Sequence, residues 1–140
     1  MELEKSAGTI IFRKDKEVLY YLLLHYQAGH WDFPKGNIEK GEELTETARR
    51  ETEEETGVGD IEFIQRFKEK INYFYQRGSK KIYKTVVFFL AETKTEEVKL
   101  SFEHQDFEWL SYEKTLKRLT HKNAKEILKK ANEVLLKLET

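Results

Sequence analysis

The 140-residue sequence contains no cysteine, one methionine and one proline. The absence of cysteine excludes a disulfide framework, a thiolate zinc site and a cysteine nucleophile. No stretch rich in proline, glycine or serine divides the chain, and it has neither an internal repeat nor a low-complexity tail. We therefore expect a single domain over residues 1–140, which buries roughly 68–70% of the surface that its unfolded chain exposes.

The chain also lacks an excess of charge, because 25 Lys and Arg stand against 26 Asp and Glu, for a net charge of -1. A polyanion must therefore be bound by a local site rather than by a global field. No apolar run approaches the length of a membrane span, and the segment MELEKSAGTIIFR carries acids before its apolar run, unlike a signal peptide. We expect a soluble, cytoplasmic protein with no membrane partner and no stable nucleic-acid partner; the sequence leaves its oligomeric state open.

Charges of both signs are abundant, since 36% of the residues are Asp, Glu, Lys or Arg. Lys and Glu dominate this set, while methionine and cysteine are almost absent. This bias is typical of proteins from hyperthermophiles. The composition therefore predicts a thermophile source and a high melting temperature.

Six segments are strand-like, because they are rich in β-branched and aromatic residues and are bounded by turn signals. Polar residues 14–17 suit a hairpin turn after the first segment, and residues 77–79 (RGS) suit another turn. Residues 85–91 (TVVFFLA) are almost wholly apolar, which is typical of a central strand covered on both faces. The expected strands are residues 7–13, 18–25, 61–70, 72–76, 82–91 and 106–110.

Two segments have helical patterns. The first, residues 44–56, has few apolar residues and is followed by Gly57, which suits a C-terminal cap. The second has a plain amphipathic stripe, typical of a helix that packs on a core. The order strands, helix, strands, helix indicates an α+β fold in which a mixed β-sheet lies between helices. The stripe comprises Ala124, Ile127, Leu128, Ala131, Val134, Leu135 and Leu138.

The most informative run covers residues 36–58 and fits the pattern Gx5Ex7REUxEExGU, where U is apolar. Residues three and four apart share a helix face, so Glu51, Glu54 and Glu55 are expected to point together. Such carboxylates repel one another unless a cation or an arginine neutralises them, and hard divalent cations prefer oxygen ligands. The run therefore predicts a Mg²⁺ or Mn²⁺ site held against a phosphate. Its fixed positions are Gly36, Glu42, Arg50, Glu51, Glu54, Glu55 and Gly57.

Arg50 precedes the first of these carboxylates and is within reach of Glu46 on the helix and of Glu42 or Glu43 at its start. We expect it to orient carboxylates rather than to bind substrate. The competing interpretation of the run is a solvated acidic helix in a chain with 22 glutamates. The seven fixed positions recur by chance in such a chain with a probability on the order of 10⁻⁵, which favours the metal site.

The run resembles the signature box of the Nudix hydrolases, enzymes that cleave nucleoside diphosphates linked to another group. Thr52 departs from the general box at one apolar position. The resemblance implies an α/β/α sandwich, two or more divalent cations, and attack of water on a phosphorus of a pyrophosphate bridge. By matching position it implies that Glu51, Glu54 and Glu55 are metal ligands, joined by the carbonyl of Gly36.

Segments outside the box are similar to the asymmetric diadenosine tetraphosphate hydrolases within this family. The resemblance implies that Glu103 is a further metal ligand or the residue that activates water. Lys35 and Lys84 are expected to neutralise phosphate oxygens. Tyr73 is expected to stack on adenine, with Tyr83 or His121 as alternatives. The matching segments are residues 31–36 (WDFPKG), Thr52, Asn72-Tyr73, Lys84-Thr85 and Glu103-His104-Gln105.

The candidate residues have structural interpretations as well, because a strand tyrosine is commonly half-buried packing, a surface lysine is commonly solvated, and His104 as readily hydrogen-bonds the backbone. The sequence also leaves open which carboxylate is the general base. The candidate catalytic residues are Glu51, Glu54, Glu55, Glu103 and Arg50, and the candidate metal ligands are the same four glutamates with Gly36. The candidate substrate-binding residues are His30, Lys35, Tyr73, Tyr83, Lys84 and His104.

The leading hypothesis is the metal-dependent hydrolysis of diadenosine tetraphosphate to ATP and AMP. A first alternative keeps the chemistry and changes the substrate to an RNA 5′-triphosphate, a nucleotide sugar or an inositol pyrophosphate. The lack of an extended basic, aromatic-interleaved surface argues against long RNA. A second alternative is a non-catalytic nucleotide-binding module, and the intact charged positions of the box argue against it.

Overall fold

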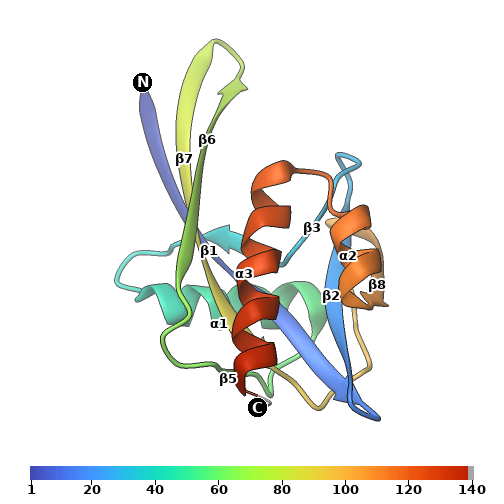
Figure 1. Ribbon diagram of the computed structural model, residues 1–140. Coiled ribbons are helices and arrows are strands. Elements are labelled where there is room, and N and C mark those ends of the chain that lie inside the picture. The colour runs from blue at the N-terminus through green and yellow to red at the C-terminus, as the bar shows by residue number, and fades with distance from the viewer. Residues whose placement is uncertain (139–140) are drawn as a thin grey trace.

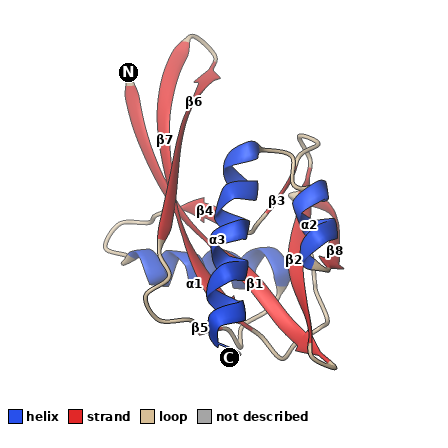
Figure 2. Cartoon of the chain, in the orientation of Figure 1, coloured by secondary structure: helices blue, strands red, loops and turns tan. Residues whose placement is uncertain are grey.

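The computed structural model describes residues 1–138 and consists of one mixed eight-stranded sheet with α1 on one face and α3, flanked by α2, on the other (Figures 1 and 2). This arrangement confirms the expected α+β sandwich. None of the helices in the described residues is long and apolar enough to cross a membrane. The strands are β1 (Glu2–Asp15), β2 (Val18–Tyr26), β3 (Trp31–Asp32), β4 (Lys35–Asn37), β5 (Glu62–Phe63), β6 (Glu69–Arg77), β7 (Lys80–Glu92) and β8 (His104–Leu110), and the helices are α1 (Leu44–Thr56), α2 (Tyr112–Arg118) and α3 (Lys122–Leu138).

The long strand β1 organises the sheet. It pairs in parallel with β7 from Glu2 opposite Ile82 to Phe12 opposite Glu92, and its far end pairs antiparallel with β2. The short strand β4 pairs with the middle of β1, while β6 pairs antiparallel with β7. The start of β1 and the β6–β7 hairpin thus project together past the helices as a three-stranded arm (Figure 1).

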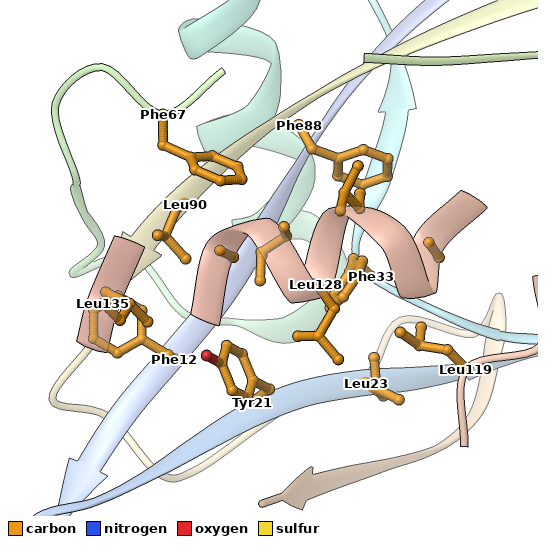
Figure 3. Packing of buried hydrophobic residues seen from close by; sticks show 14 of the residues in the cluster. Phe12, Tyr21, Leu23, Phe33, Phe67, Phe88, Leu90, Leu119, Leu128 and Leu135 are labelled. Atoms are coloured by element: carbon orange, nitrogen blue, oxygen red, sulfur yellow. The ribbon is translucent and has the colours of Figure 1, made fainter. Parts of the chain in front are cut away.

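Strand β7 is covered on both faces, as its apolar sequence predicts. Phe88 and Leu90 belong to the main core cluster beneath α3, whereas Val87 and Phe89 pack with Ala48 of α1 on the other face. Figure 3 shows Phe88 and Leu90 lying with Leu128 of α3 in this core. Each large apolar side chain that is fully buried contributes about 1.5–3 kcal/mol, so the two faces fix the sheet between its helices.

Helix α1 begins and ends at the expected residues. At its start the Glu43 N–H donates to the Glu46 carboxylate over 2.8 Å. At its end Gly57 adopts a left-handed conformation (φ 74°), and its N–H donates to the Glu53 carbonyl over 2.8 Å. Because only a narrow face with Ala48 packs on the sheet, the carboxylates of the next turns are left for other contacts.

The first hairpin turn is tighter than expected, because β1 continues to Asp15 and only Lys16 and Glu17 form the turn. Both residues have positive φ, of 49° and 68°, which is the geometry that matches a two-residue hairpin to the twist of its strands. Glycine or asparagine usually signals such a turn, and their absence explains why the sequence suggests a longer loop.

The structure differs from the sequence prediction in three further respects. Residues 61–70 are not one strand, because the chain turns after β5, with Arg66 at φ 70°, and buries Phe67 in the core before β6 begins. Helix α2 is missing from the sequence prediction, since it spans seven residues and buries only Thr115 fully. Leu138 continues the apolar stripe of α3 but is 65% exposed at the helix end.

Candidate active site

Gly36 of β4 lies directly beneath α1, the helix that carries the box carboxylates and is called the box helix below. A Cβ atom built on Gly36 would collide with the carboxylate of Glu51. Glycine at this position leaves room for the Glu51 carboxylate, which a side chain here would displace. Strand β4 is held in place by pairing with β1, where Gly36 lies opposite Ala7.

Glu55 is the buried carboxyl of the box, with 4% of its surface exposed. Its Oε1 accepts the Lys35 backbone N–H over 3.3 Å and lies 3.4 Å from the Tyr26 hydroxyl. Burial, followed by the hydrogen bond and the negative charge of Glu51, raises the pKa of Glu55 well above its usual range. A cation bound between these two carboxyl groups would therefore favour the ionised form of Glu55.

Arg50 ties the carboxylates of the box together. Its guanidinium donates to Glu42 over 2.7 Å, to Glu51 over 2.8 Å and to Glu54 over 3.2 Å. It also donates to the Asn37 carbonyl over 3.0 Å, which joins the helix to the loop after β4. The contact with Glu42 is one of those that the spacing allows, whereas no bond to Glu43 or Glu46 is made by this side chain.

The bond from Arg50 lowers the pKa of Glu42 from 4.5 to about 2. A carboxylate whose pKa is depressed by folding stabilises the native state above pH 4.5 and loses that contribution as pH falls toward 2. We expect wild type to melt at a higher temperature than Glu42→Gln near neutral pH, and this difference to shrink between pH 4.5 and 2. Thermal melting at stepped pH measures it. A difference that stays constant through this window would contradict the assignment.

The other predicted metal ligands are less enclosed. The Glu54 side chain is 57% exposed and pairs with Arg50, and Glu103 is exposed on the turn before β8. Within residues 1–138, no three His, Asp or Glu side chains already converge on a point where an ion would lie. The donors nevertheless suit a hard divalent cation, because Glu51 and Glu55 are in contact, Glu54 follows on the same helix face, and a glycine leaves room beside them.

A pocket of about 780 Å³ opens beside Gly36. It lies between the inner face of the arm and the start of α3. Four predicted substrate-binding residues line it, namely His30, Lys35, Tyr73 and Lys84, and so does His121. The other lining residues are Tyr26, Asp32, Gly36, Ile71, Phe74, Tyr75, Lys122, Asn123 and Ala124.

The two predicted lysines of this pocket are ion-paired. Lys35 Nζ lies 3.0 Å from Asp32 Oδ2, and both side chains are almost wholly buried, at 12% and 6% exposed. Burial acts to lower the pKa of Lys35, but Asp32 and its other neighbours outweigh burial and raise it. Lys84 Nζ lies 3.4 Å from Glu4, yet burial and the charge of Lys35 leave its pKa lowered. Both positive charges are thus held at fixed positions on the pocket wall.

Aromatic rings line the pocket beside these lysines. The rings of Tyr26 and His30 stack with centroids 4.6 Å apart, and His121 lies 5.6 Å from His30. The ammonium of Lys35 lies 5.2 Å from the Tyr26 ring, a cation–π distance. Tyr73 is half-buried on the inner face of the arm. Flat rings and cations are therefore adjacent.

Two predicted substrate-binding residues lie outside the pocket. Tyr83 is on the outer face of the arm, where its ring lies 4.8 Å from that of Phe74. His104 is buried, with its side chain 0% exposed, and faces the Glu55 carboxylate at 3.6 Å. Its position beneath a box carboxylate separates it from the pocket wall.

Sequence reasoning missed several residues of the wall. Asp32 carried a weak signal, because it lies three residues before Lys35 in the segment that leads into the box. Tyr26 ends an apolar strand, and nothing in the sequence indicated that it would line a pocket. Glu4 reaches Lys84 only because β1 and β7 pair in parallel register, a contact between residues 80 positions apart.

Comparison with known proteins agrees with this geometry. The NUDIX domain model matches residues 2–131. The bis(5′-nucleosyl)-tetraphosphatase (asymmetrical) of Sus scrofa is 36% identical to this chain, covering 94% of this chain and 95% of that protein. The crystal structure of a Caenorhabditis elegans Ap4A hydrolase binary complex superposes with a TM-score of 0.84 at 30% identity, covering 95% of this chain and 98% of that one.

A further similarity covers about half of the chain. The RNA pyrophosphohydrolase of Pelagibacter ubique is 32% identical over 73 residues, which is 52% of this chain and 46% of that protein. Of the relatives named here, the tetraphosphatase and the Ap4A hydrolase are similar over nearly the full length of this chain. The chain belongs to the Nudix family, as a Nudix hydrolase most like the Ap4A hydrolases.

Proposed function

We propose that this chain hydrolyses diadenosine tetraphosphate asymmetrically, so that one water and one substrate give ATP and AMP. The observation that carries the proposal is the pocket beside Gly36, which combines Lys35 and Lys84 with the Tyr73 ring next to the box carboxylates. A nucleoside linked to a long polyphosphate needs both features, cations for its phosphates and a flat apolar ring for its base. The relatives named above support the choice of substrate.

The box carboxylates are proposed to hold two or more Mg²⁺ or Mn²⁺ ions, with Glu51, Glu54, Glu55 and Glu103 as ligands beside the Gly36 carbonyl. Bound divalent ions supply charge neutralisation at the bridging oxygens and lower the pKa of a bound water. The protein's own part is to hold the ligand oxygens of the carboxylates and of the Gly36 carbonyl in fixed positions and to exclude other cations. Arg50 serves this positioning, because one guanidinium holds three carboxylates of the box.

The pocket residues are proposed to bind the rest of the substrate. Lys35 and Lys84 neutralise phosphate oxygens as point charges, with His30 beside them. Tyr73 offers its ring to one adenine, and His121, which also lines the pocket, is a second ring. In a substrate placed in this way, the polyphosphate extends past Gly36 toward the box carboxylates.

The test is a product analysis. Wild-type protein with Mg²⁺ is incubated separately with diadenosine tetraphosphate, triphosphorylated RNA and a nucleotide sugar, and the products are separated by chromatography. We expect equal amounts of ATP and AMP from the first substrate at a rate well above the others. Two ADP per substrate would falsify the asymmetric reaction, and faster turnover of RNA would favour the pyrophosphohydrolase suggested by the similarity over half of the chain. Tight nucleotide binding without turnover would identify a binding module.

The structure provides a matched pair of tyrosines for testing the pocket. Tyr73 lines it, whereas Tyr83 of the neighbouring strand lies on the outer face of the arm. Because stacking on a base contributes about 1–3 kcal/mol, we expect Tyr73→Ala to raise KM for diadenosine tetraphosphate about 5- to 100-fold. Tyr83→Ala is expected to leave KM unchanged. Steady-state kinetics decide, and equal effects of the two substitutions would argue that the pocket does not bind the base.

A further inference from the structure

The turn that carries Glu103 is fastened to the box helix and to β2 by the backbone. The Ser101 N–H donates to the Glu55 carbonyl over 3.3 Å, and the Gln27 N–H donates to the Glu103 carbonyl over 3.3 Å. The Gln105 side chain donates to the Gln27 carbonyl over 3.2 Å. Glu103 is thereby held beside the end of α1, although it belongs to a different element from the other carboxylates.

His104 lies at the centre of this junction. Its Nδ1 is 3.0 Å from the Ser101 hydroxyl oxygen, which in turn accepts the Glu103 backbone N–H over 3.4 Å. Its ring packs edge-on against the Tyr26 ring, with the ring centroids 4.4 Å apart and the ring planes at 71°. With its side chain 0% exposed, the imidazole has one fixed orientation.

We infer the tautomer of this histidine from the contacts of Ser101. The hydroxyl oxygen accepts the Glu103 N–H, and its own proton has His104 Nδ1 within reach as an acceptor. When Nδ1 accepts, the neutral ring carries its proton on Nε2. The Nε2–H group then points toward Glu55.

Nε2 of His104 is buried and makes no hydrogen bond to any described residue. A buried donor without an acceptor is costly, and native structures leave few of them. The Glu55 Oε1 atom, at 3.6 Å, is the carboxylate oxygen that this donor faces. A small rotation of the Glu55 side chain closes this gap to a hydrogen bond, so the orphan donor points to Glu55 as its partner.

We propose that His104 is a positioning residue that fixes Glu55 relative to Glu103. A chain of hydrogen bonds runs from the Glu103 backbone through the Ser101 hydroxyl and the His104 ring to the Glu55 carboxylate. This chain of hydrogen bonds joins a carboxylate on α1 to one on the turn before β8. Residues that hydrogen-bond to metal ligands typically set the orientation of those ligands. The inference rests on the proposed function in one respect, since it takes both carboxylates to serve one metal site.

The proposal is tested by measuring the affinity of the protein for Mn²⁺ by electron paramagnetic resonance. No nucleotide is added, so the affinity depends directly on the carboxylates. We expect His104→Phe, which keeps the ring shape and lacks the N–H, to weaken Mn²⁺ binding roughly 10- to 100-fold. His104→Gln places an amide N–H near the same point and is expected to recover most of this loss. Ser101→Ala is expected to weaken binding by a smaller factor.

A matched control separates positioning from stability. Thr115→Val removes a buried hydroxyl of α2 that donates to the carbonyls of Leu110 and Ser111, the two residues before the helix, far along the chain from the box. It is expected to lower the melting temperature while Mn²⁺ binding stays unchanged. If His104→Phe also lowers only the melting temperature, or if His104→Gln recovers nothing, the histidine is packing and the proposal is overturned.

Nitrogen NMR of the histidines in wild-type, metal-free protein gives a readout that needs no variant to fold. We expect the His104 proton on Nε2, and in Ser101→Ala a loss of this single tautomer. A proton on Nδ1 in the wild type would overturn the proposal. Neither this measurement nor Mn²⁺ binding uses a substrate, so a failure to cleave diadenosine tetraphosphate would count against the proposed function alone.

Discussion

Replacing Glu55 by glutamine is expected to lower kcat for diadenosine tetraphosphate by about 10³-fold while the protein remains folded. In the cation-bound protein the substitution removes a negative charge from the centre of the carboxylate cluster, and it keeps the size of the side chain. In the metal-free protein the pKa of Glu55 is raised by burial and by Glu51, so the buried group is close in charge to an amide. The Lys35 N–H that Oε1 accepts is equally well accepted by an amide oxygen.

The measurement is kcat with saturating Mg²⁺, together with a melting curve for each protein. Glu53→Gln is the matched control, because Glu53 is an exposed glutamate of the same helix that points away from the other three. We expect it to keep wild-type turnover. Near-normal turnover in Glu55→Gln would show that the buried carboxylate is not part of the reaction.

Contacts that are local in the chain could be predicted from the sequence. The bounds of α1, its glycine cap and the reach of Arg50 to Glu42 all follow from spacing within 15 residues. The approach of Gly36 to Glu51 agrees with what the resemblance to the Nudix box implies, that Gly36 lies beside the box carboxylates. A motif encodes such contacts, because its positions fix which side chains share a helix face and where the backbone needs room.

Contacts between distant strands could not be predicted. The sequence offered Tyr73 as the stacking residue and Tyr83 as an alternative to it. The one-to-one register of β6 and β7 sets Tyr73 opposite Lys84 and Tyr83 opposite Phe74. Neighbouring positions of a strand face opposite sides, so this register alone decides which ring lines the pocket. The burial of His104 beneath Glu55 likewise depends on how β8 docks along β2.

Lys35→Met is expected to reduce both stability and activity, because Lys35 neutralises a buried carboxylate as well as lining the pocket. Removing one partner of a buried ion pair leaves the other charge uncompensated, which costs about 3–5 kcal/mol. Asp32 is the partner, with its side chain 6% exposed. We expect the free energy of unfolding to fall by about this amount in urea titrations, and kcat/KM for diadenosine tetraphosphate to fall at least as strongly as in Tyr73→Ala.

The double variant Asp32→Asn/Lys35→Met separates the two roles of the lysine. The asparagine keeps the oxygen that accepts the Phe33 N–H over 2.7 Å and removes the uncompensated charge, so most of the lost stability is expected to return. Activity is expected to stay low, because no cation then faces the substrate phosphates at this position. Recovery of kcat/KM along with stability would mean that Lys35 serves only to neutralise Asp32, and the phosphate contact would then have to come from Lys84 and His30 across the same pocket.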